Sequence, residues 1–539
     1  MSENLPAPEE PHLERHSAWA PLRFPTFRTL WLVWLASNAC MWMNDVAAAW
    51  QMTTLTTSPT LIALVQTASS LPVFLLGLPS GALADIVDRR RYFIVTQFWI
   101  AATASVLFLV TLTGHLTAPV LLVLVFLNGI GLAMRWPVYA AILPEVVPRA
   151  QLGEALALNA VAVNTSRVIG PLIAGIVISA AGTEYVFALN CAVSIAAGIA
   201  LVMWKRPAPK PSVLPGERFI GAMRLGFQYV RESSGMRNAL VRIASFFLHS
   251  TAVFALMPIV AQRFGSGGAQ TYTALLAAMG VGAILLATQL PRLRRHWNRD
   301  RIAGVGSVVT GLAMVALAFA PHAWVAAAAM FVAGAAWILV ANSVTISAQL
   351  SLPDWVRARG MAIYQMSIMG ATALGAYIWG RLAEMTTIPT SLAAGGLSML
   401  VVTFLIRNRT LELDADLTPT HPFDEPVPAL PIELDDGPVM VTIEYVVDPA
   451  RRTEFDAIMA ESRSARMRAG AVSWGLFEDI ERPARFVEYF ACDSWADYLR
   501  RFDRFTAADA ELHQRRHAFH IAESPIRISR FIARHPPAR

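Results

Sequence analysis

The sequence predicts an all-α membrane bundle of twelve transmembrane helices in two pseudo-symmetric six-helix halves, followed by a soluble α+β domain. Composition is the first support: of 539 residues, 55% are hydrophobic and 15% charged, whereas a soluble domain carries roughly a quarter charged residues. The second is a series of long apolar segments separated by short loops, with basic residues gathered in alternate loops. The third is a change to soluble-domain composition after Arg409.

The apolar segments are long enough to cross a bilayer, because about 20 helical residues span ~30 Å of hydrocarbon. The predicted spans cover residues 28–52, 60–84, 92–113, 118–142, 154–180, 184–204, 239–263, 272–290, 302–320, 323–348, 360–381 and 388–406.

The distribution of basic residues predicts the orientation of these spans. Lys and Arg gather in one alternate set of loops, and short basic loops mark the cytoplasmic side of a membrane. The opposite loops, over residues 53–58, 114–117 and 320–322, hold neither residue. Both termini are therefore predicted to be cytoplasmic. Because the positive charge lies in short loops, the net charge of +6 does not indicate nucleic acid binding.

An internal repeat supports the division into halves. A shift of 205 residues pairs Gly77 with Gly282, Arg89 and Arg90 with Arg294 and Arg295, Gly170 with Gly375, and Gly175 with Gly380. Such an offset is typical of transporters built from repeated halves, although chance matching is the alternative in a chain rich in Gly and Ala. The predicted parts are a cytoplasmic N-terminal tail (1–27), the first half (28–204), a basic linker (205–238), the second half (239–408), an acidic proline-rich linker (409–437) and the soluble domain (438–539).

The basic linker contains an amphipathic helix over residues 217–231. Such a helix either lies on the anionic inner leaflet or packs against the bundle, and its sequence does not separate the two.

Ionisable residues inside membrane spans are functional candidates, because a charge at that depth is costly. Asp45 lies in the outer part of the first span, where a desolvated carboxylate would exchange protons or, if hydrated, only help to form a gate. Arg167 lies near the middle of the fifth span and stays protonated, so it is a candidate for binding an anionic group or for pairing with Asp45. The alternative for Arg167 is a structural lock between helices.

Several polar residues accompany these two charges. Asn44, Asn164 and Gln365 are candidates to line the same cavity. Arg135 is expected to extend to the inner interface and anchor its helix there. Lone polar residues at membrane depth, namely Gln66, Asn128, His249, Asn342 and Gln365 itself, are expected chiefly to hydrogen-bond between helices.

A charged motif follows the second span. Gly81, Asp85 and the run Arg89, Arg90 and Arg91 resemble the loop between helices 2 and 3 of the major facilitator superfamily, with Ile86 and Asp88 departing from its pattern. The resemblance implies a cytoplasmic gate whose charge pairs form in one state of the transporter.

A second motif lies in the fifth span. Gly170, Pro171 and Gly175 resemble the helix 5 signature of facilitator antiporters. Proline removes a backbone hydrogen bond and glycines permit close helix contact, so ordinary small-residue packing would give the same pattern.

The soluble domain is predicted to have the order βαββαβ, beginning with the alternating strand over residues 439–447. It resembles the small, usually dimeric α+β domains of the antibiotic-biosynthesis monooxygenase type. His513, His517 and His520 lie on neighbouring helix turns, as in a metal site, but a solvated helix is the preferred interpretation and no metal is predicted.

As a whole the chain resembles the transmembrane secretion effectors related to the enterobactin exporter. Trp31–Leu32, Trp42–Met43, the run 143–148 and Arg167 with Gly170 and Pro171 carry this likeness. It implies a proton-coupled exporter of a small amphipathic molecule, such as a siderophore or antibiotic, in a bacterial inner membrane, working by alternating access without a cofactor. The expected partners are the substrate, membrane lipids and a second copy of the chain bound through the C-terminal domain. The alternatives are an uptake facilitator, or a transporter fused to a cargo-modifying enzyme domain.

Overall fold

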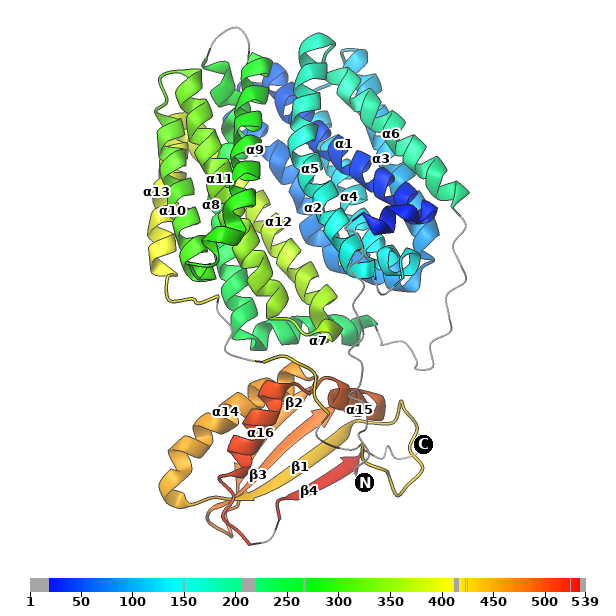
Figure 1. The fold of residues 1–539 in the computed structure, drawn as a ribbon, viewed down its shortest axis with the longest axis vertical. Coiled ribbons are helices and arrows are strands. Elements are labelled where there is room, and N and C mark those ends of the chain that lie inside the picture. The colour runs from blue at the N-terminus through cyan, green and yellow to red at the C-terminus, as the bar shows by residue number, and fades with distance from the viewer. Residues whose placement is uncertain are drawn as a thin grey trace, which may run out of the picture.

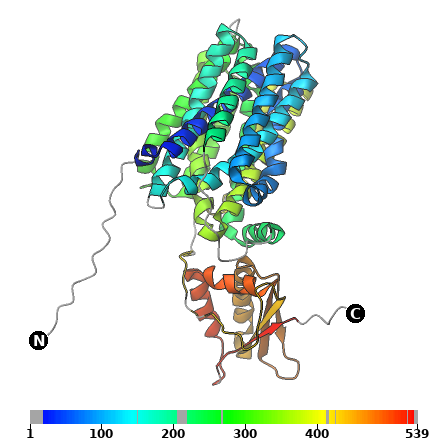
Figure 2. The ribbon, with the colours of Figure 1, turned by 90° about the vertical axis from the view of Figure 1, so that its right-hand side faces the viewer.

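The computed structural model describes residues 19–148, 151–204, 219–264, 268–411, 416–421, 423, 425–523 and 525–533. It consists of a helical bundle and a smaller α+β domain, here called the tail, which lies beyond one end of the bundle (Figure 1). Figure 2 shows the same two parts from the side, with the helices of the tail on one face of its sheet.

Six helices form the first half of the bundle. Prolines open several of them, because the first turn of a helix needs no partner for the missing N–H. The helices are α1 (Pro25–Leu55), α2 (Pro59–Ile86), α3 (Arg89–Leu112), α4 (Ala118–Val146), α5 (Leu152–Ala180) and α6 (Thr183–Met203).

Six further helices form the second half, after the connecting helix α7 (Phe219–Glu232). They are α8 (Ser234–Gln262), α9 (Gly268–Leu293), α10 (Arg299–Ala318), α11 (Ala323–Leu350), α12 (Asp354–Met385) and α13 (Ile388–Leu405). The predicted order of spans is therefore present, and each helix begins and ends within six residues of the predicted bounds.

Among the described residues, 11 helices are long and apolar enough to cross a membrane. The predicted first span, α1, is not among them, because Asn38, Asn44 and Asp45 interrupt its apolar residues. It nevertheless packs in the bundle against α5 and α6. The all-α membrane fold is confirmed, and α1 occupies the position of its first span.

The internal repeat corresponds to equivalent helix contacts in the two halves. A side chain at Gly170 would meet Ala39 and Trp42 of α1, and one at Gly375 would overlap the Leu248 carbonyl of α8. The matched glycines therefore join α5 to α1 and α12 to α8 in the same way.

A second matched pair lies where the halves meet. A side chain at Gly175 of α5 would overlap Thr273 of α9, and one at Gly380 of α12 would overlap Ala63 of α2. The interface between the halves is thus formed by α5 with α9 and by α2 with α12. These contacts make chance matching an insufficient explanation of the repeat.

The tail has the predicted order of strands and helices, with the separate helices from Trp495 and from Ala507 that its sequence indicates. Its elements are β1 (Val439–Val446), α14 (Arg452–Arg468), β2 (Ser473–Glu478), β3 (Arg485–Cys492), α15 (Trp495–Asp503), α16 (Ala507–His517) and β4 (Arg527–Ile532). The antiparallel sheet has the order β2-β3-β1-β4, and Val441 faces both Phe490 and Arg530 across it. Val441, Ile443 and Tyr445 are buried under the helices, so one face of the sheet forms the tail core.

Helix α7 joins the tail to the bundle (Figure 1). Its Gln228 amide donates to the carbonyls of Met467 (2.8 Å) and Ala471 (2.6 Å) at the end of α14. Its Tyr229 hydroxyl donates to the Ser351 carbonyl, just before α12, over 3.1 Å. These contacts correspond to the packed-helix interpretation of the basic linker.

The segment predicted as a proline-rich linker lies against the tail where it is described. The Ala507 amide donates to the Thr418 carbonyl, and the Thr420 amide donates to the Phe505 carbonyl, each over 3.0 Å. Residues 416–421 therefore pack on the tail surface, although their composition is typical of a linker.

Candidate functional site

Arg167 lies near the middle of α5, between aromatic rings from both halves of the bundle. Its guanidinium carbon is 5.3 Å from the ring centre of Trp42, on α1, and 4.3 Å from that of Trp337, on α11. Trp42 and Trp337 also lie near the middle of their helices. The site therefore places a permanent cation, held by π-faces, at the depth where transporters bind substrate.

The Arg167 guanidinium is not fully satisfied by protein groups. Its Nε is buried without a hydrogen-bond partner among the described residues. A buried N–H without an acceptor is unfavourable, so this group would gain from an acceptor on a bound molecule.

Asp45 lies one helical turn beyond Trp42 on α1 and is partly buried. Its carboxylate lies beside the Ser69 hydroxyl of α2. It also interacts electrostatically with Tyr272 of α9. Asp45 and Arg167 form no ion pair in this conformation of the described chain, although both lie next to residues of the second half.

The accompanying polar residues fall into different positions. Asn44 is buried and accepts a hydrogen bond from the Asn190 amide of α6 over 3.3 Å, so it joins two helices of one half. Asn164 is exposed one turn before Arg167 and donates to the Ala160 carbonyl of its own helix over 2.8 Å. Gln365 is exposed on α12. Asn164 therefore lies on the same face of α5 as Arg167. Asn44 is instead used in the contact between α1 and α6.

The arginine run begins α3 at one end of the bundle. Arg89 Nη1 forms an ion pair with Glu145 of α4 at 2.7 Å. Arg90 Nε donates to the Leu201 carbonyl at the end of α6 over 3.1 Å, and Asp88 caps α3 by accepting from the Arg91 amide over 2.8 Å. Gly81 lies near the end of α2, whereas the Asp85 side chain is outside the described part of the structure.

Two predictions for polar groups are wrong. Arg135 does not extend to the interface: it is 1% exposed and donates to the Ser37 carbonyl of α1 over 3.3 Å. Within the described part of the chain, Gln66 and His249 form hydrogen bonds to Ser70 and Ser245 on their own helices and none to another helix. The expectation holds for Asn128, which donates to Thr103 of α3 over 3.1 Å. Asn342 accepts from Arg294, which lies directly after the end of α9.

Sequence reasoning missed Trp42 and Trp337 as site residues. Composition alone gives no reason to select two of 15 tryptophans. Their position in the sequence could have identified them, because Trp42 and Trp337 each lie near the middle of a predicted span, as Arg167 does.

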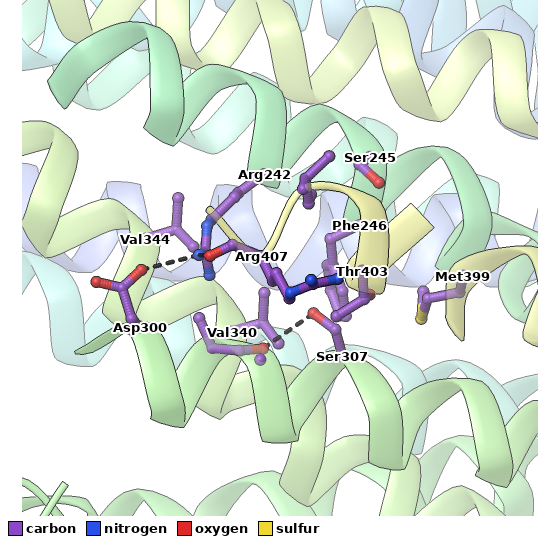
Figure 3. A pocket seen from close by; sticks show the side chains of 13 residues that line it. Arg242, Ser245, Phe246, Asp300, Ser307, Val340, Val344, Met399, Thr403 and Arg407 are labelled. Atoms are coloured by element: carbon purple, nitrogen blue, oxygen red, sulfur yellow. Dashed lines mark hydrogen bonds and ion pairs between the residues drawn. The ribbon is translucent and has the colours of Figure 1, made fainter. Parts of the chain in front are cut away.

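A small cavity of about 120 Å³ lies in the second half between α8, α10 and α13 (Figure 3). Arg242 and Asp300 form an ion pair at 2.8 Å beside it, as Figure 3 shows. The Asp300 carboxylate also accepts from the Leu411 amide over 3.0 Å, and Arg242 Nε donates to the Arg409 carbonyl over 2.7 Å. The pair therefore holds the backbone that follows α13 against the bundle. The cavity itself is smaller than the ~300 Å³ of typical ligand sites.

Comparisons with known proteins agree with this architecture. A family model described as transmembrane secretion effector matches residues 16–537. The staphyloferrin A transporter of Staphylococcus aureus is 23% identical over 391 residues, which cover 69% of this chain and 94% of that protein. The enterobactin exporter EntS of Shigella boydii is 23% identical over 72% of this chain and 92% of its own length. Macrolide efflux protein A of Streptococcus pyogenes is 24% identical over 51% of this chain and 68% of its own length.

Solved structures share the fold at low identity. A POT family transporter in complex with a thioalcohol-conjugated peptide has a TM-score of 0.58 at 12% identity, covering 70% of this chain and 95% of that one. The nucleoside transporter NupG has a TM-score of 0.53 at 15% identity, covering 71% and 98%. With its two six-helix halves and the family model spanning nearly its whole length, the chain belongs to the transmembrane secretion effector family of major facilitator transporters.

Proposed function

We propose that this membrane transporter exports a small amphipathic molecule, such as a siderophore or an antibiotic, in exchange for protons and by alternating access. The relatives named for staphyloferrin A, enterobactin and macrolides support this range of cargo. The arrangement of Arg167 between Trp42 and Trp337 is the observation that carries the proposal.

The two rings belong to different halves of the bundle, and alternating access moves one half relative to the other. Arg167 therefore cannot keep both ring contacts throughout the cycle. An anionic or aromatic group of the cargo would replace the lost ring, because a guanidinium binds carboxylates through two N–H groups and also stacks on aromatic faces. Arg167 would thereby link the binding of cargo to the relative position of the two halves.

Asp45 is proposed as the proton site. It is a carboxylate within the bundle whose neighbours, Ser69 of α2 and Tyr272 of α9, come from different halves. Movement of the halves would change its surroundings and hence its affinity for a proton. The exposed Asn164 is proposed to line the path to Arg167, and Gln365 the facing wall on α12.

The end of the bundle that carries the arginine run is proposed to face the cytoplasm of a bacterial cell, at its inner membrane. Arg89, Arg90 and Arg91 begin α3 there, and short basic loops remain on the cytoplasmic side. The tail is joined to the same end through α7, so it too would be cytoplasmic. The Arg89–Glu145 pair, together with Asp85, is proposed as a gate that forms in one state only.

A second copy of the chain is the proposed partner of the open face of the tail sheet. Met440, Phe477 and Phe531 point to the side opposite the helices and are 40%, 60% and 51% exposed. Apolar side chains on a sheet face are usually covered, and an identical face offers a self-complementary cover. Sedimentation in detergent should give a dimer, and Phe477→Glu should give a monomer.

Transport in inverted vesicles tests the export proposal. Vesicles that hold the full chain would be given an acid-inside proton gradient and offered labelled enterobactin, staphyloferrin A or erythromycin. We expect accumulation of at least one of these, loss of accumulation when the gradient is collapsed, and no gradient-driven uptake with Arg167→Gln or Asp45→Asn. Arg263→Gln, at the end of α8, is the matched control. Accumulation that ignores the gradient and survives both variants would refute the coupling, and accumulation only in right-side-out vesicles would indicate an uptake facilitator.

A further inference from the structure

The tail contains a cavity of about 470 Å³ between the helix-covered face of its sheet and helices α14, α15 and α16. Its volume lies in the range of about 300–1,000 Å³ that is usual for small-molecule sites. The apolar part of its wall includes Val441, Ile443 and Leu512. None of the residues discussed for transport lines it, so it is a separate feature of the molecule.

The cavity has an excess of positive charge. Four guanidinium groups line it, from Arg466, Arg501, Arg516 and Arg530, and the lining carboxylate is that of Asp509. Asp509 is engaged in the cap of α16, where its carboxylate accepts hydrogen bonds from the amide (3.1 Å) and the hydroxyl (2.8 Å) of the cap residue.

The carboxylate of Glu488 lies behind the wall and has no capacity left for a cavity ligand. It is fully buried, and it accepts from the hydroxyls of Tyr445 and Ser462 at 3.1 Å each. It also accepts from Arg466 Nε at 3.2 Å and from Trp474 Nε1 at 3.0 Å, and it forms an ion pair with Arg516 Nη1 at 3.6 Å. Against four arginines, these two carboxylates leave an excess of two positive charges.

Two of the arginines have buried donors without an acceptor. Arg501 is 8% exposed and Arg516 is 3% exposed, and the Nε of each has no hydrogen-bond partner among the described residues. The hydrogen-bond acceptor of Arg501 Nη1 among the described residues is the weak Cys492 Sγ, at 3.8 Å. The terminal nitrogens of Arg516 are better placed, with Nη1 donating to the Ser462 hydroxyl at 2.6 Å and Nη2 lying 3.1 Å from His513 Nδ1. Buried donors normally have acceptors, so these groups indicate a ligand that supplies oxygen atoms.

Aromatic side chains surround the charged groups. The guanidinium carbon of Arg501 lies 3.9 Å from the ring centre of Phe490, and that of Arg466 lies 4.6 Å from the same ring. Phe502 and Phe505 line the cavity further along, and Phe423, from the connecting segment, packs on Phe505 with ring centres 5.5 Å apart. A planar ring is the shape that such walls accommodate best.

We propose that the tail cavity is a binding site for a small aromatic carboxylate. The ring lies among Phe490, Phe502 and Phe505, and the carboxylate accepts hydrogen bonds from Arg501 and Arg516 inside the cavity. Arg530, on the exposed edge strand β4, extends the same positive charge to the rim, where its Nε donates to the Tyr498 hydroxyl over 2.7 Å.

Calorimetric titration of the full chain in lipid nanodiscs with 2-naphthoate tests the proposal. The titration is run in the Arg167→Gln variant, so that aromatic acids binding in the bundle do not contribute and failure of the transport proposal does not affect the result. We expect one site per chain for 2-naphthoate, and binding at least tenfold weaker for the neutral 2-naphthamide.

Variants separate the cavity from other surfaces. Arg501→Gln should weaken 2-naphthoate binding at least tenfold, while Arg500→Gln on the same helix, whose partner is Asp497 at 2.9 Å, should leave it unchanged. Arg530→Gln, on the exposed rim, should weaken binding severalfold without risk to the core. No binding of 2-naphthoate at millimolar concentration, equal binding of the neutral amide, or binding indifferent to both Arg501→Gln and Arg530→Gln would each overturn the proposal.

Discussion

The guanidinium carbon of Arg167, on α5, lies 4.3 Å from the ring centre of Trp337, on α11, so a cation of the first half rests on an aromatic ring of the second. Contacts of this kind are worth about 2 kcal/mol or more when desolvated. Because Arg167 and Trp337 belong to different halves, the strength of their contact depends on the separation of the halves.

Arg167→Lys should reduce transport although it keeps the charge. A lysine ammonium lacks the planar group that stacks on a ring and binds a carboxylate through two donors. We expect a loss of about tenfold in the rate of vesicle accumulation, which corresponds to ~1.4 kcal/mol. Trp337→Phe retains a ring and should lose less than Trp337→Ala, and equal losses for the two tryptophan variants would contradict the ring contact.

Gly175→Ala should impair closure of the halves against each other. The new side chain would overlap Thr273 of α9, and overpacking in a well-packed contact costs typically ~1–3 kcal/mol. The variant should have a lower melting temperature in detergent. The double variant with Thr273→Ala should recover part of the loss, because that change removes two of the overlapping atoms. Gly153→Ala, where a side chain meets open space, is the control.

Glu145→Gln should lower the transport rate more than it lowers stability. The Arg89–Glu145 pair is partly exposed, at 28% and 24% for the two side chains, and such pairs contribute only about 0–1 kcal/mol. Asp85→Asn is expected to act in the same way, with substrate affinity nearly unchanged. Initial rates at several cargo concentrations separate the two effects, and a selective rise in the half-saturating concentration would contradict a role in gating.

The tail should become less stable as the pH falls from about 6.5 toward 4. Burial, with the charges of His517 and Arg516, lowers the pKa of His513 to about 3, and burial with Arg516 and His520 lowers that of His517 to about 4. Unfolded histidine has a pKa near 6.5, so over this range the unfolded tail binds protons that the folded tail does not.

Glu488 adds to the loss only at lower pH. Its bonds to Arg466 and Arg516 outweigh burial and hold the pKa of its carboxyl well below the ordinary range, so its contribution declines only once the pH passes below about 4.5. Pulse proteolysis of the tail in urea, at pH 7.5 and pH 5.5 on the full chain, measures the dependence. His513→Asn should reduce it, and an unchanged pH dependence in that variant would count against the assignment.

Gln228→Ala should loosen the tail from the bundle. The side chain supplies hydrogen bonds to two backbone carbonyls of the tail, each worth about 0.5–1.5 kcal/mol. Amide hydrogen exchange in α7 should accelerate, whereas Arg231→Ala, whose side chain is 70% exposed, should have no effect. Equal exchange in both variants would show that other contacts hold the tail.

The helices and the strand order of the tail were accessible from the sequence because apolar length and alternation are local properties. The ring partners of Arg167 were not, because Trp42 and Trp337 are almost 300 residues apart and meet only through packing of the two halves. Arg135 was misplaced for a related reason: its depth along α4 was predicted, but not that α1 would supply a carbonyl and a ring for it.

The connecting segment also sets a limit on how the tail can be moved between proteins. Phe423 and His421 lie upstream of the first strand and yet form part of the cavity wall. A recombinant fragment starting at Val439 would contain the whole sheet, but its cavity would lack the part of the wall that His421 and Phe423 form. The connecting segment and the tail therefore form one binding unit. A fragment meant to keep the cavity intact should begin before residue 416.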